Sequence, residues 1–595
     1  MEPQHVTTPS RARVVDAARA MTLAVVVGIL AAVGAFLFHA IIALFHNLFF
    51  FGRFSFAYDA ATHTHASPLG AWIIVIPVVG ALIVAFLVRD FAHEARGAGV
   101  AEVIDAVYYR RGVIRPAVAW VKTLAASVSL GSGGAVGREG PIIQIGAALG
   151  SAFGQWVRVP AWERTMLVAA GASAGIAATF NAPAAGILFA IEMILPETSV
   201  RTLVPVMLAA VSATEIGRTL LGTGTLLAFP SVAIPLSGTA GVETLGFYAV
   251  LGVALGLVSL LFIRTVYAFE DGFQRIPGNY YIRHALGMAV VGVILYLLVR
   301  HSGHYYVQGL SYATVHDIVV GQIVSWRFLL LLLVLKLLAT SLTLGSGSSG
   351  GIFSPSLFLG AALGAAYAQI LGPWLPVALQ AQLPGAVLAG MGGLVAGATG
   401  AVLTAVVMIV ELTGNHTAIV PLLLTAALAY GVRRIWLRHN MYSMKLYRRG
   451  HHIPDFLQTN VYLLRAVQDV LPTPCVFIDL AAGEDAAAVE VDAETLVHGV
   501  GVDGQQVLGV LDAGRMQELR RRGARRAEWS TALDTHFAVV AARAPVADVL
   551  GAMRSRRCVF ALVTSDGTLH GADSVLGVVS REELLQGGVL PDEWD

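Results

Sequence analysis

Charge is scarce in this sequence: Asp, Glu, Lys and Arg make up 13% of its 595 residues, about half the share usual for a soluble protein. Cysteine is nearly absent, and the two present, Cys475 and Cys558, exclude a disulfide framework; no spacing of residues predicts a metal site. The formal net charge of +1 gives no basis for nucleic-acid binding. Apolar residues instead reach 56% and the mean hydropathy is +0.71, which predicts a membrane protein.

Long apolar runs predict helices that cross a bilayer. The first run is long and has no clear cleavage site, so we interpret it as a membrane helix rather than a signal peptide. Arginines precede the first run, and arginines with a lysine follow the last, which predicts two cytoplasmic termini and a place in the plasma or inner membrane. The runs cover residues 21–44, 72–87, 203–213, 245–263, 284–298, 328–344 and 419–430.

One segment of the sequence occurs twice. Residues 122–150 (KTLAASVSLGSGGAVGREGPIIQIGAALG) return as residues 336–364 (KLLATSLTLGSGSSGGIFSPSLFLGAALG), with 15 of 29 positions identical. Both copies contain GSG, then Gly and Pro at matched spacing. An internal repeat in a membrane chain is typical of transport folds, whose substrate site lies near the bilayer midplane where the two halves meet.

The repeat continues further along the chain, since residues 170–192 resemble residues 389–411. Glycine and alanine are frequent in both copies, which predicts close helix packing in lipid. We therefore divide the chain into a cytoplasmic N-terminal segment, a first membrane repeat, a linker, a second membrane repeat with a terminal helix, and a cytoplasmic tail. Their ranges are 1–19, 20–217, 218–239, 240–450 and 459–595.

The repeated loops have the chemistry of an anion site. Glycine allows backbone N–H groups to point at one spot, and Pro141 and Pro355 suit the first turn of a helix. Each loop should therefore end at a helix N-terminus, where free amides and the helix dipole favour a negative charge. The alternative is that the glycines serve only helix packing, which explains one loop better than two matched copies.

Four ordered motifs resemble the CLC family of chloride channels and chloride/proton exchangers: GREGP at 137–141, FNAPAAGILFAIE at 180–192, GGIFSP at 350–355 and NMYSMKLYRRG at 440–450. The resemblance covers essentially the whole chain. It implies an all-α polytopic membrane domain, an inverted repeat of about eighteen helices, followed by an α+β cytoplasmic pair of CBS domains. It also implies a homodimer in the lipid bilayer that transports chloride or another small anion, without a cofactor and without enzyme activity.

The resemblance assigns roles to individual residues. Glu139 becomes a gating glutamate, because a carboxylate among helix N-terminal amides competes with chloride for the same position. A simple salt bridge between Glu139 and Arg138 is the plainer alternative. The implied anion-binding residues are Ala98, Gly99, Arg138, Glu139, Gly140, Gly351, Ile352, Phe353 and Tyr442.

Two departures from the family pattern bear on mechanism. Ala98 stands where a serine hydroxyl usually contacts the central anion, which leaves the preference among chloride, nitrate and bromide open. Met193 stands where exchangers usually have a proton-transfer glutamate, and a thioether cannot relay protons. Its neighbour Glu192 lies about 100° around the helix and cannot simply replace it. Met193 therefore favours a glutamate-gated chloride channel, with a chloride/proton antiporter as the alternative.

A hydrolase is a remote alternative. Residues 171–175 fit the G-x-S-x-G nucleophile pattern around Ser173. That pattern requires a strand and a sharp turn before the serine. Here it lies among small residues typical of packed helices, with no motif that supplies partners for a catalytic triad.

The tail changes to soluble patterning after residue 459. Residues 498–519 and 560–584 each predict strand, Asp-Gly turn, strand and helix, in the order typical of paired CBS domains. Such pairs often bind adenine nucleotides through G-x-x-[ST]-x-x-D, and the second copy offers Gly577, Ser580 and Glu583 in place of that motif. Because the match is imperfect, a domain that only dimerises or couples to the gate is the favoured alternative.

Overall fold

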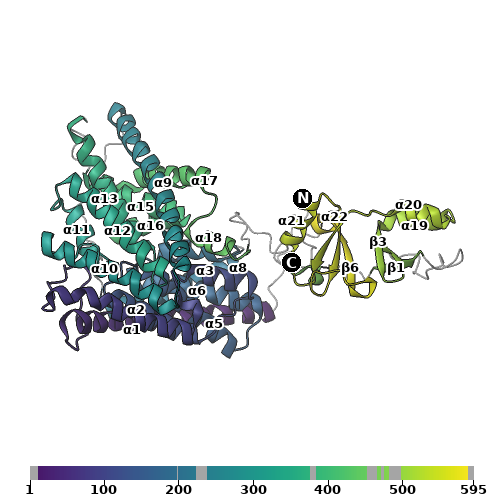
Figure 1. Cartoon of the computed structure of the whole chain (residues 1–595), viewed down its shortest axis with the longest axis horizontal. Helices are drawn as coiled ribbons and strands as arrows, with labels where there is room; N and C mark the ends of the chain where they lie inside the picture. The colour runs from purple at the N-terminus through teal and green to yellow at the C-terminus, as the bar shows by residue number, and fades with distance from the viewer. Residues whose placement is uncertain are drawn as a thin grey trace. The chain divides into compact units, whose positions relative to one another are not determined.

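The computed structural model describes residues 11–196, 198–222, 238–374, 383–451, 465–470, 475–480 and 498–586. The chain forms two compact units, Met1–Leu457 and Gln458–Asp595. The first is entirely helical in its described part, and the second contains two small sheets with short helices (Figure 1). Eight helices of the described residues are long and apolar enough to cross a membrane. The prediction of a multi-pass membrane protein is therefore confirmed.

The first half of the helical unit follows the apolar pattern of the sequence. The long runs become α1, α2 and α8, and the Gly-interrupted stretches between α2 and α8 become the helices α3 to α7. Most of the predicted linker, residues 223–237, lies outside the described residues. The helices of this half are α1 (Arg11–Phe51), α2 (Val75–Asp90), α3 (Val100–Tyr109), α4 (Ala117–Gly131), α5 (Glu139–Trp156), α6 (Ala161–Phe180), α7 (Pro183–Phe189) and α8 (Val200–Leu221).

The second half repeats this order of helices. Helix α12 corresponds to α4, α13 to α5, α15 to α6 and α16 to α7 by the sequence repeat, and α17 corresponds to α8 by its place in the order. A final short helix, α18, follows the second repeat. The helices of this half are α9 (Gly238–Arg275), α10 (Tyr280–Ser302), α11 (Tyr312–Val319), α12 (Trp326–Ser346), α13 (Phe353–Leu371), α15 (Leu383–Thr399), α16 (Val402–Thr413), α17 (Ile419–Trp436) and α18 (Met441–Tyr447).

Repeat-related glycines bring helix backbones into contact. A Cβ added to Gly146 of α5 would overlap the carbonyl oxygen of Gly171 in α6. In the second half, a Cβ on Gly360 of α13 would likewise overlap the carbonyl oxygen of Gly390 in α15. In lipid, helix association depends on such close packing rather than on hydrophobic burial. The predicted role of small residues in helix packing is confirmed.

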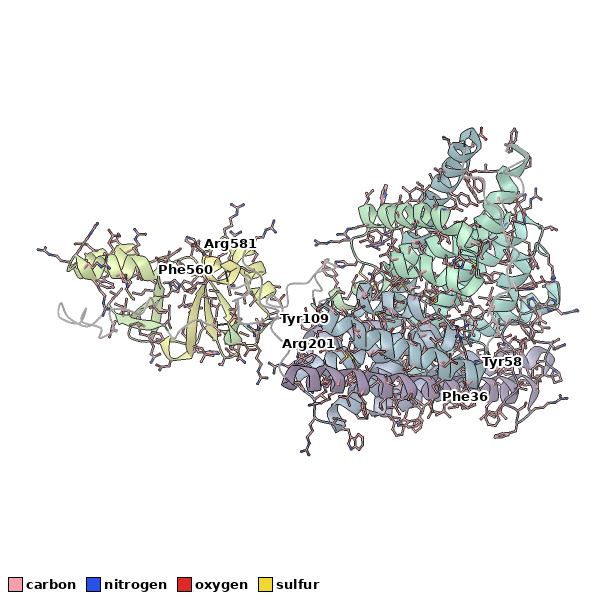
Figure 2. The ribbon with its side chains drawn as sticks, turned by 180° about the vertical axis from the view of Figure 1, so that it is seen from behind. Phe36, Tyr58, Tyr109, Arg201, Phe560 and Arg581 are labelled. Atoms are coloured by element: carbon pink, nitrogen blue, oxygen red, sulfur yellow. The ribbon has the colours of Figure 1, made fainter. Side chains whose placement is uncertain are left out.

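Apolar side chains also cover the outside of the helical unit. Phe36 on α1 is 37% exposed and projects from the ribbon in Figure 2. Val79 and Leu82 of α2 and Leu257 of α9 are similarly exposed. Exposed apolar side chains on several long helices are expected where lipid replaces water as the solvent.

The second unit contains two three-stranded sheets of the same design. In each sheet the first two strands are parallel and the last two antiparallel, in the orders β1-β2-β3 and β4-β5-β6. This matches the predicted pair of CBS domains. The strands are β1 (Val476–Asp479), β2 (Gly499–Asp503), β3 (Gln506–Leu511), β4 (Phe537–Ala541), β5 (Phe560–Thr564) and β6 (Val575–Ser580), with helices α19 (Ala513–Arg521), α20 (Arg526–Ala532), α21 (Val546–Arg556) and α22 (Arg581–Gln586).

Candidate functional site

The two repeated loops pair directly with each other. Gly137, before α5, and Gly351, before α13, exchange two backbone hydrogen bonds of 2.7 Å each as an antiparallel bridge. The two glycines are equivalent in the repeat, so each pairs with its own counterpart, as expected for loops related by a two-fold axis. The loop before α3 joins them, since Gly97 N donates to Ser348 O at 2.9 Å and Gly350 N to Gly97 O at 3.2 Å. The N-terminal ends of α3, α5 and α13 therefore converge.

This convergence leaves no room for side chains at the contact. A Cβ on Gly140 would overlap the carbonyl oxygen of Ala98 and lie 3.1 Å from the Cα of Gly351. A Cβ on Gly351 would lie 2.8 Å from the amide nitrogen of Gly140. The opposing atoms belong to backbone, which cannot rotate away as a side chain could. The glycines of the loops thus have a packing role that is specific to this meeting point.

Glu139 places its carboxylate at the end of the opposite helix. Its side chain is buried, Oε1 accepts a hydrogen bond from the Tyr312 hydroxyl at 2.5 Å, and Oε2 accepts one from the Ser354 amide at 3.3 Å. Ser354 is the second residue of α13. Unpaired N–H groups and the positive end of the helix dipole favour an anion at this position. The carboxylate therefore lies where the sequence places the anion-binding loop.

Arg138 turns away from Glu139. Its Nη1 lies 3.1 Å from Nδ1 of His39 on α1, and its guanidinium lies over the rings of Phe180 and Tyr312 at 5.3 Å and 5.5 Å from their centroids. No ion pair joins Arg138 to Glu139 in the described chain. The plainer interpretation of Glu139 as a salt-bridge partner of Arg138 is wrong. The buried guanidinium instead adds positive charge beside the loops.

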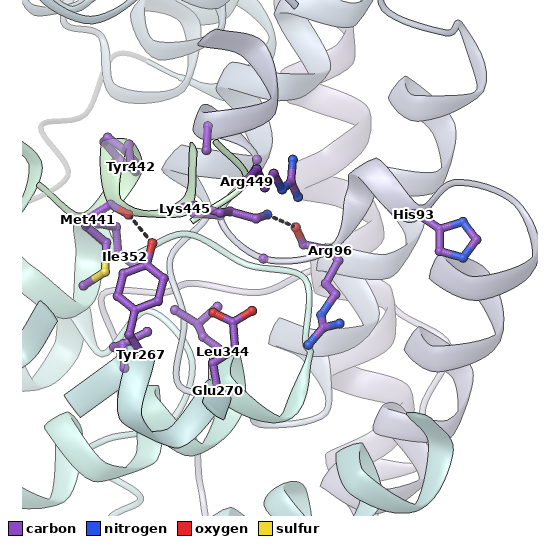
Figure 3. A pocket seen from close by; sticks show the side chains of 15 residues that line it. His93, Arg96, Tyr267, Glu270, Leu344, Ile352, Met441, Tyr442, Lys445 and Arg449 are labelled. Carbon is purple, nitrogen blue, oxygen red and sulfur yellow. Dashed lines mark hydrogen bonds between the residues drawn. The ribbon is translucent and has the colours of Figure 1, made fainter. Parts of the chain in front are cut away.

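A cavity of about 250 Å³ borders the site on the side of α18, lined by Ala98, Gly99, Ile352 and Tyr442 (Figure 3). Tyr442 is buried and belongs to the first turn of α18. That helix is held in place by the Tyr267 hydroxyl, which donates to its first carbonyl at 2.6 Å. Four predicted anion-binding residues thus share one cavity, while Phe353 is buried at the start of α13.

The mouth of this cavity is rich in positive charge. Lys445 and Arg449 both pair with Glu102, at 3.0 Å and 2.7 Å. Arg96 also lines the cavity and belongs to no ion pair within the described residues. Arg96, Lys445 and Arg449 together carry three positive charges. The carboxylates of Glu102 and of Glu270, which lines the cavity, carry two negative charges, so the entrance of the cavity has a net positive charge. Such a field raises the local concentration of small anions.

The comparison with known proteins agrees with this geometry. Residues 80–434 match the family described as voltage gated chloride channel. The chain belongs to this CLC family. It is similar to the H(+)/Cl(−) exchange transporter ClcA of Vibrio parahaemolyticus, with 32% identity over 392 residues, 64% of this chain and 80% of that protein. ClcA of Vibrio cholerae is 34% identical over 369 residues, 61% of this chain and 76% of the relative.

Solved CLC structures share the fold. A slow cyanobacterial Cl−/H+ antiporter aligns with a TM-score of 0.62 and 24% identity, covering 72% of this chain and 98% of its own. A eukaryotic CLC transporter aligns with a TM-score of 0.59 and 20% identity, covering 95% of this chain and 98% of its own. The second alignment extends over the tail as well. The predicted fold class, a CLC membrane domain followed by a CBS pair, is confirmed.

Two buried lysines reveal a part of the CLC repeat that is weak in sequence. Lys122 and Lys336 are repeat equivalents and fully buried. Lys122 Nζ donates to the Gly97 carbonyl at 2.6 Å, before α3, and Lys336 Nζ to the Gly309 carbonyl at 2.9 Å, before α11. The carbonyls satisfy ammonium groups that would be costly to bury alone. Helices α3 and α11 are therefore also a repeated pair.

Tyr312 was not predicted as a site residue, although it holds Glu139. It is the first residue of α11, as Val100 is of α3. Aligned on the lysine contacts, GLSYATVHD at 309–317 is a second copy of GAGVAEVID at 97–105, with four identities. That alignment is the signal that could have identified Tyr312. Ser354 carried no such signal, since its contribution comes from the backbone.

Glu192 and Met193 lie on a short π-helical segment, Ala190–Ile194, after α7. The Glu192 carboxylate accepts hydrogen bonds from the amides of Leu403 and Thr404 at 2.9 Å and 2.8 Å, at the start of α16. The relation is reciprocal, because Glu411 of α16 accepts from two amides at the start of α7 at 3.0 Å and 2.8 Å. Glu192 therefore caps a helix of the opposite repeat.

Ser173 has none of the geometry of a catalytic nucleophile. It lies inside the continuous helix α6, fully buried. A nucleophile elbow needs a strand followed by a sharp turn. The G-x-S-x-G match is consequently a stretch of small helix-packing residues. The position of Ser173 gives no support to the hydrolase alternative.

The predicted nucleotide residues of the tail lie at the end of β6. Glu583 Oε2 accepts hydrogen bonds from the Ser580 amide at 2.8 Å and its hydroxyl at 2.9 Å, and lies 3.1 Å from His498 Nε2. Gly577 lies within β6. The acid at the position of the ribose-binding Asp is thus already engaged within the tail. Binding of an adenine nucleotide stays a prediction, and it would require Glu583 to exchange these partners.

The Glu583 contacts predict acid sensitivity of this part of the tail. Burial raises the pKa of the Glu583 carboxyl, but hydrogen bonds from His498 and Ser580 outweigh burial and lower the pKa from 4.5 to about 2. The stabilisation is therefore complete above pH 4.5 and is lost as the pH falls toward 2. Hydrogen exchange of residues 575–586 in the full chain should accelerate over this range. Glu583→Gln should exchange rapidly at every pH; a pH profile identical to wild type would contradict the assignment.

Proposed function

We propose that this protein exchanges chloride for protons, with Glu139 as the group that both blocks the anion pathway and carries the proton. The observation that carries the proposal is the similarity of this chain to two proteins named H(+)/Cl(−) exchange transporters. They are 32% and 34% identical to it over most of their own lengths. Chloride transport itself follows from the family. The sequence-based preference for a channel rested chiefly on Met193, and these relatives favour the alternative, exchange.

The position of Glu139 supports a physical mechanism. Its ionised carboxylate occupies the end of α13, where it excludes a second anion by charge and by volume. Protonation removes that charge and weakens the hydrogen bond from the Ser354 amide, so chloride can replace the side chain. Return of the carboxylate then requires loss of the proton and of the anion. Opposite movement of the two ions follows from competition for one position.

The proton needs a route from the inner side that avoids Met193. The cavity that reaches Ile352 and Tyr442 offers such a route, and Glu270 is the acid that lines it. Glu192 is a poor relay because two amides of α16 hold its carboxylate. Channel activity is the second candidate, favoured by the thioether at Met193, which cannot transfer a proton.

Flux measurements in liposomes distinguish the two functions. Purified protein is reconstituted, an outward chloride gradient is imposed, and external pH and chloride are recorded together. Exchange predicts uphill proton movement driven by chloride. Chloride flux that stops at the chloride equilibrium potential without proton movement would show a channel and overturn the proposal.

Ala98→Ser should tighten chloride binding. The side chain lines the cavity beside Ile352 and Tyr442, where a hydroxyl would add a donor to the anion. A net hydrogen bond of about 1 kcal/mol corresponds to roughly a fivefold lower dissociation constant. Titration calorimetry with chloride and nitrate measures the change. Ala98→Val, which adds bulk without a donor, is the matched control, and equal tightening by both variants would refute the explanation.

A further inference from the structure

A second cavity lies beside the cavity of about 250 Å³ that borders the anion site. It has a volume of about 340 Å³ and is bordered by the last turn of α9, the first turns of α10 and the end of α12. Its polar lining consists of Arg96, Gln274, Tyr280, Arg283 and Ser346. Arg96 also lines the first cavity, so it stands between the two.

The charge of this second cavity is uncompensated. It has two arginines and no acid among its lining residues. Arg96 lies over the Tyr280 ring, 5.4 Å from its centroid, and Arg283 Nε donates to the Ile276 carbonyl at 2.9 Å. In the described parts of the chain neither guanidinium forms an ion pair. Their terminal amino groups are thus available to a ligand.

We propose that this cavity binds a phosphate group, supplied by a free phosphate compound or by a lipid headgroup. Planar guanidinium groups match the oxygens of phosphate in pairs, which a monatomic halide cannot use. Two such groups around a roomy cavity, together with the side-chain amide of Gln274, suit a tetrahedral oxyanion better than chloride. The Tyr280 ring forms a rigid wall against which Arg96 is held.

The bound phosphate affects the chloride pathway through two contacts. The phosphate neutralises charge on Arg96, which otherwise adds to the positive potential of the cavity beside the anion site. Tyr280 also donates its hydroxyl to the Gly347 carbonyl at 2.6 Å, in the loop that leads to Gly351 and Ile352. Phosphate binding therefore lowers chloride occupancy at the inner side and slows chloride flux.

Two measurements on the full-length protein test the site. In the first, detergent-purified protein is titrated calorimetrically with inorganic phosphate at constant ionic strength. In the second, chloride flux is compared in phosphatidylcholine vesicles with and without phosphatidic acid. Arg283→Gln should weaken the response at least about tenfold, and Arg283→Lys should retain part of it. Arg275→Gln, which removes an exposed charge from the same end of α9 without touching the cavity, should behave as wild type.

The two measurements also identify the source of the phosphate. Saturable binding in the first assigns a free phosphate compound, and a response confined to vesicles assigns a lipid headgroup. Basal flux in neutral vesicles should be equal in Arg283→Gln and wild type, which verifies folding. The proposal is overturned if wild type responds in neither assay, or if Arg283→Gln and Arg275→Gln respond alike.

Discussion

Glu139→Ala is expected to abolish proton coupling while chloride flux continues. A methyl group can neither bind a proton nor occupy the position at the Ser354 amide, so the two events that couple the ions are both lost. Chloride flux should also lose its dependence on pH, because the carboxylate whose protonation opens the pathway is gone. Simultaneous recording of chloride and proton movement in liposomes measures the ratio, which should fall to zero.

Two further variants separate this role from general damage. Tyr312→Phe removes the hydroxyl that donates to Glu139 at 2.5 Å but keeps the carboxylate, so proton coupling should persist. Glu192→Gln should lower thermal stability, by about 1 kcal/mol, without changing the proton-to-chloride ratio. The assignment of the proton to Glu139 would be contradicted if Glu139→Ala kept a normal proton-to-chloride ratio or if Glu192→Gln lost it. Glu192 would then be the proton carrier.

The sequence identified the parts of the fold that both repeats preserve. Gly137 and Gly351 stand at the same place in two copies with 15 of 29 identities, and their mutual hydrogen bonds follow from that equivalence. The long apolar runs likewise predicted seven of the eight spanning helices of the described residues, all but Phe353–Trp374, because length and composition decide which helices can cross lipid. The paired strands of the tail followed from Asp-Gly turns between short apolar segments.

What the sequence missed depends on contacts between distant segments. Tyr312 reaches Glu139 across 173 positions, and Glu192 reaches Thr404 across 212. A pattern of spacing along the chain cannot report such pairs unless a repeat indicates them. The copy that begins at Gly309 retains too few identities to do so without the lysine contacts. Glu192 consequently looked like a neighbour of the proton path, whereas its carboxylate closes the end of α16.

Gly140→Ala is expected to disable transport by forcing the three loops apart. The added methyl would overlap the Ala98 carbonyl and crowd Gly351, both of which are backbone. Hydrogen bonds to neighbouring loops hold Gly351 and Gly97, the residue before Ala98. Overpacking of this kind costs about 1–3 kcal/mol, and here the strain falls on the helix ends that form the site. Chloride flux in liposomes should fall more than about tenfold, while size-exclusion chromatography of the folded fraction tests assembly.

Gly431→Ala is the matched control for this variant. Gly431 lies within α17, and a Cβ there would meet no atom within 4 Å. Because alanine loses less conformational freedom than glycine when a helix forms, this change should leave flux intact and raise stability slightly. Equal flux in Gly140→Ala and Gly431→Ala would mean that the loops tolerate separation. In that case the close contact between Ala98, Gly140 and Gly351 would not be what positions the anion, and Glu139 would have to act without it.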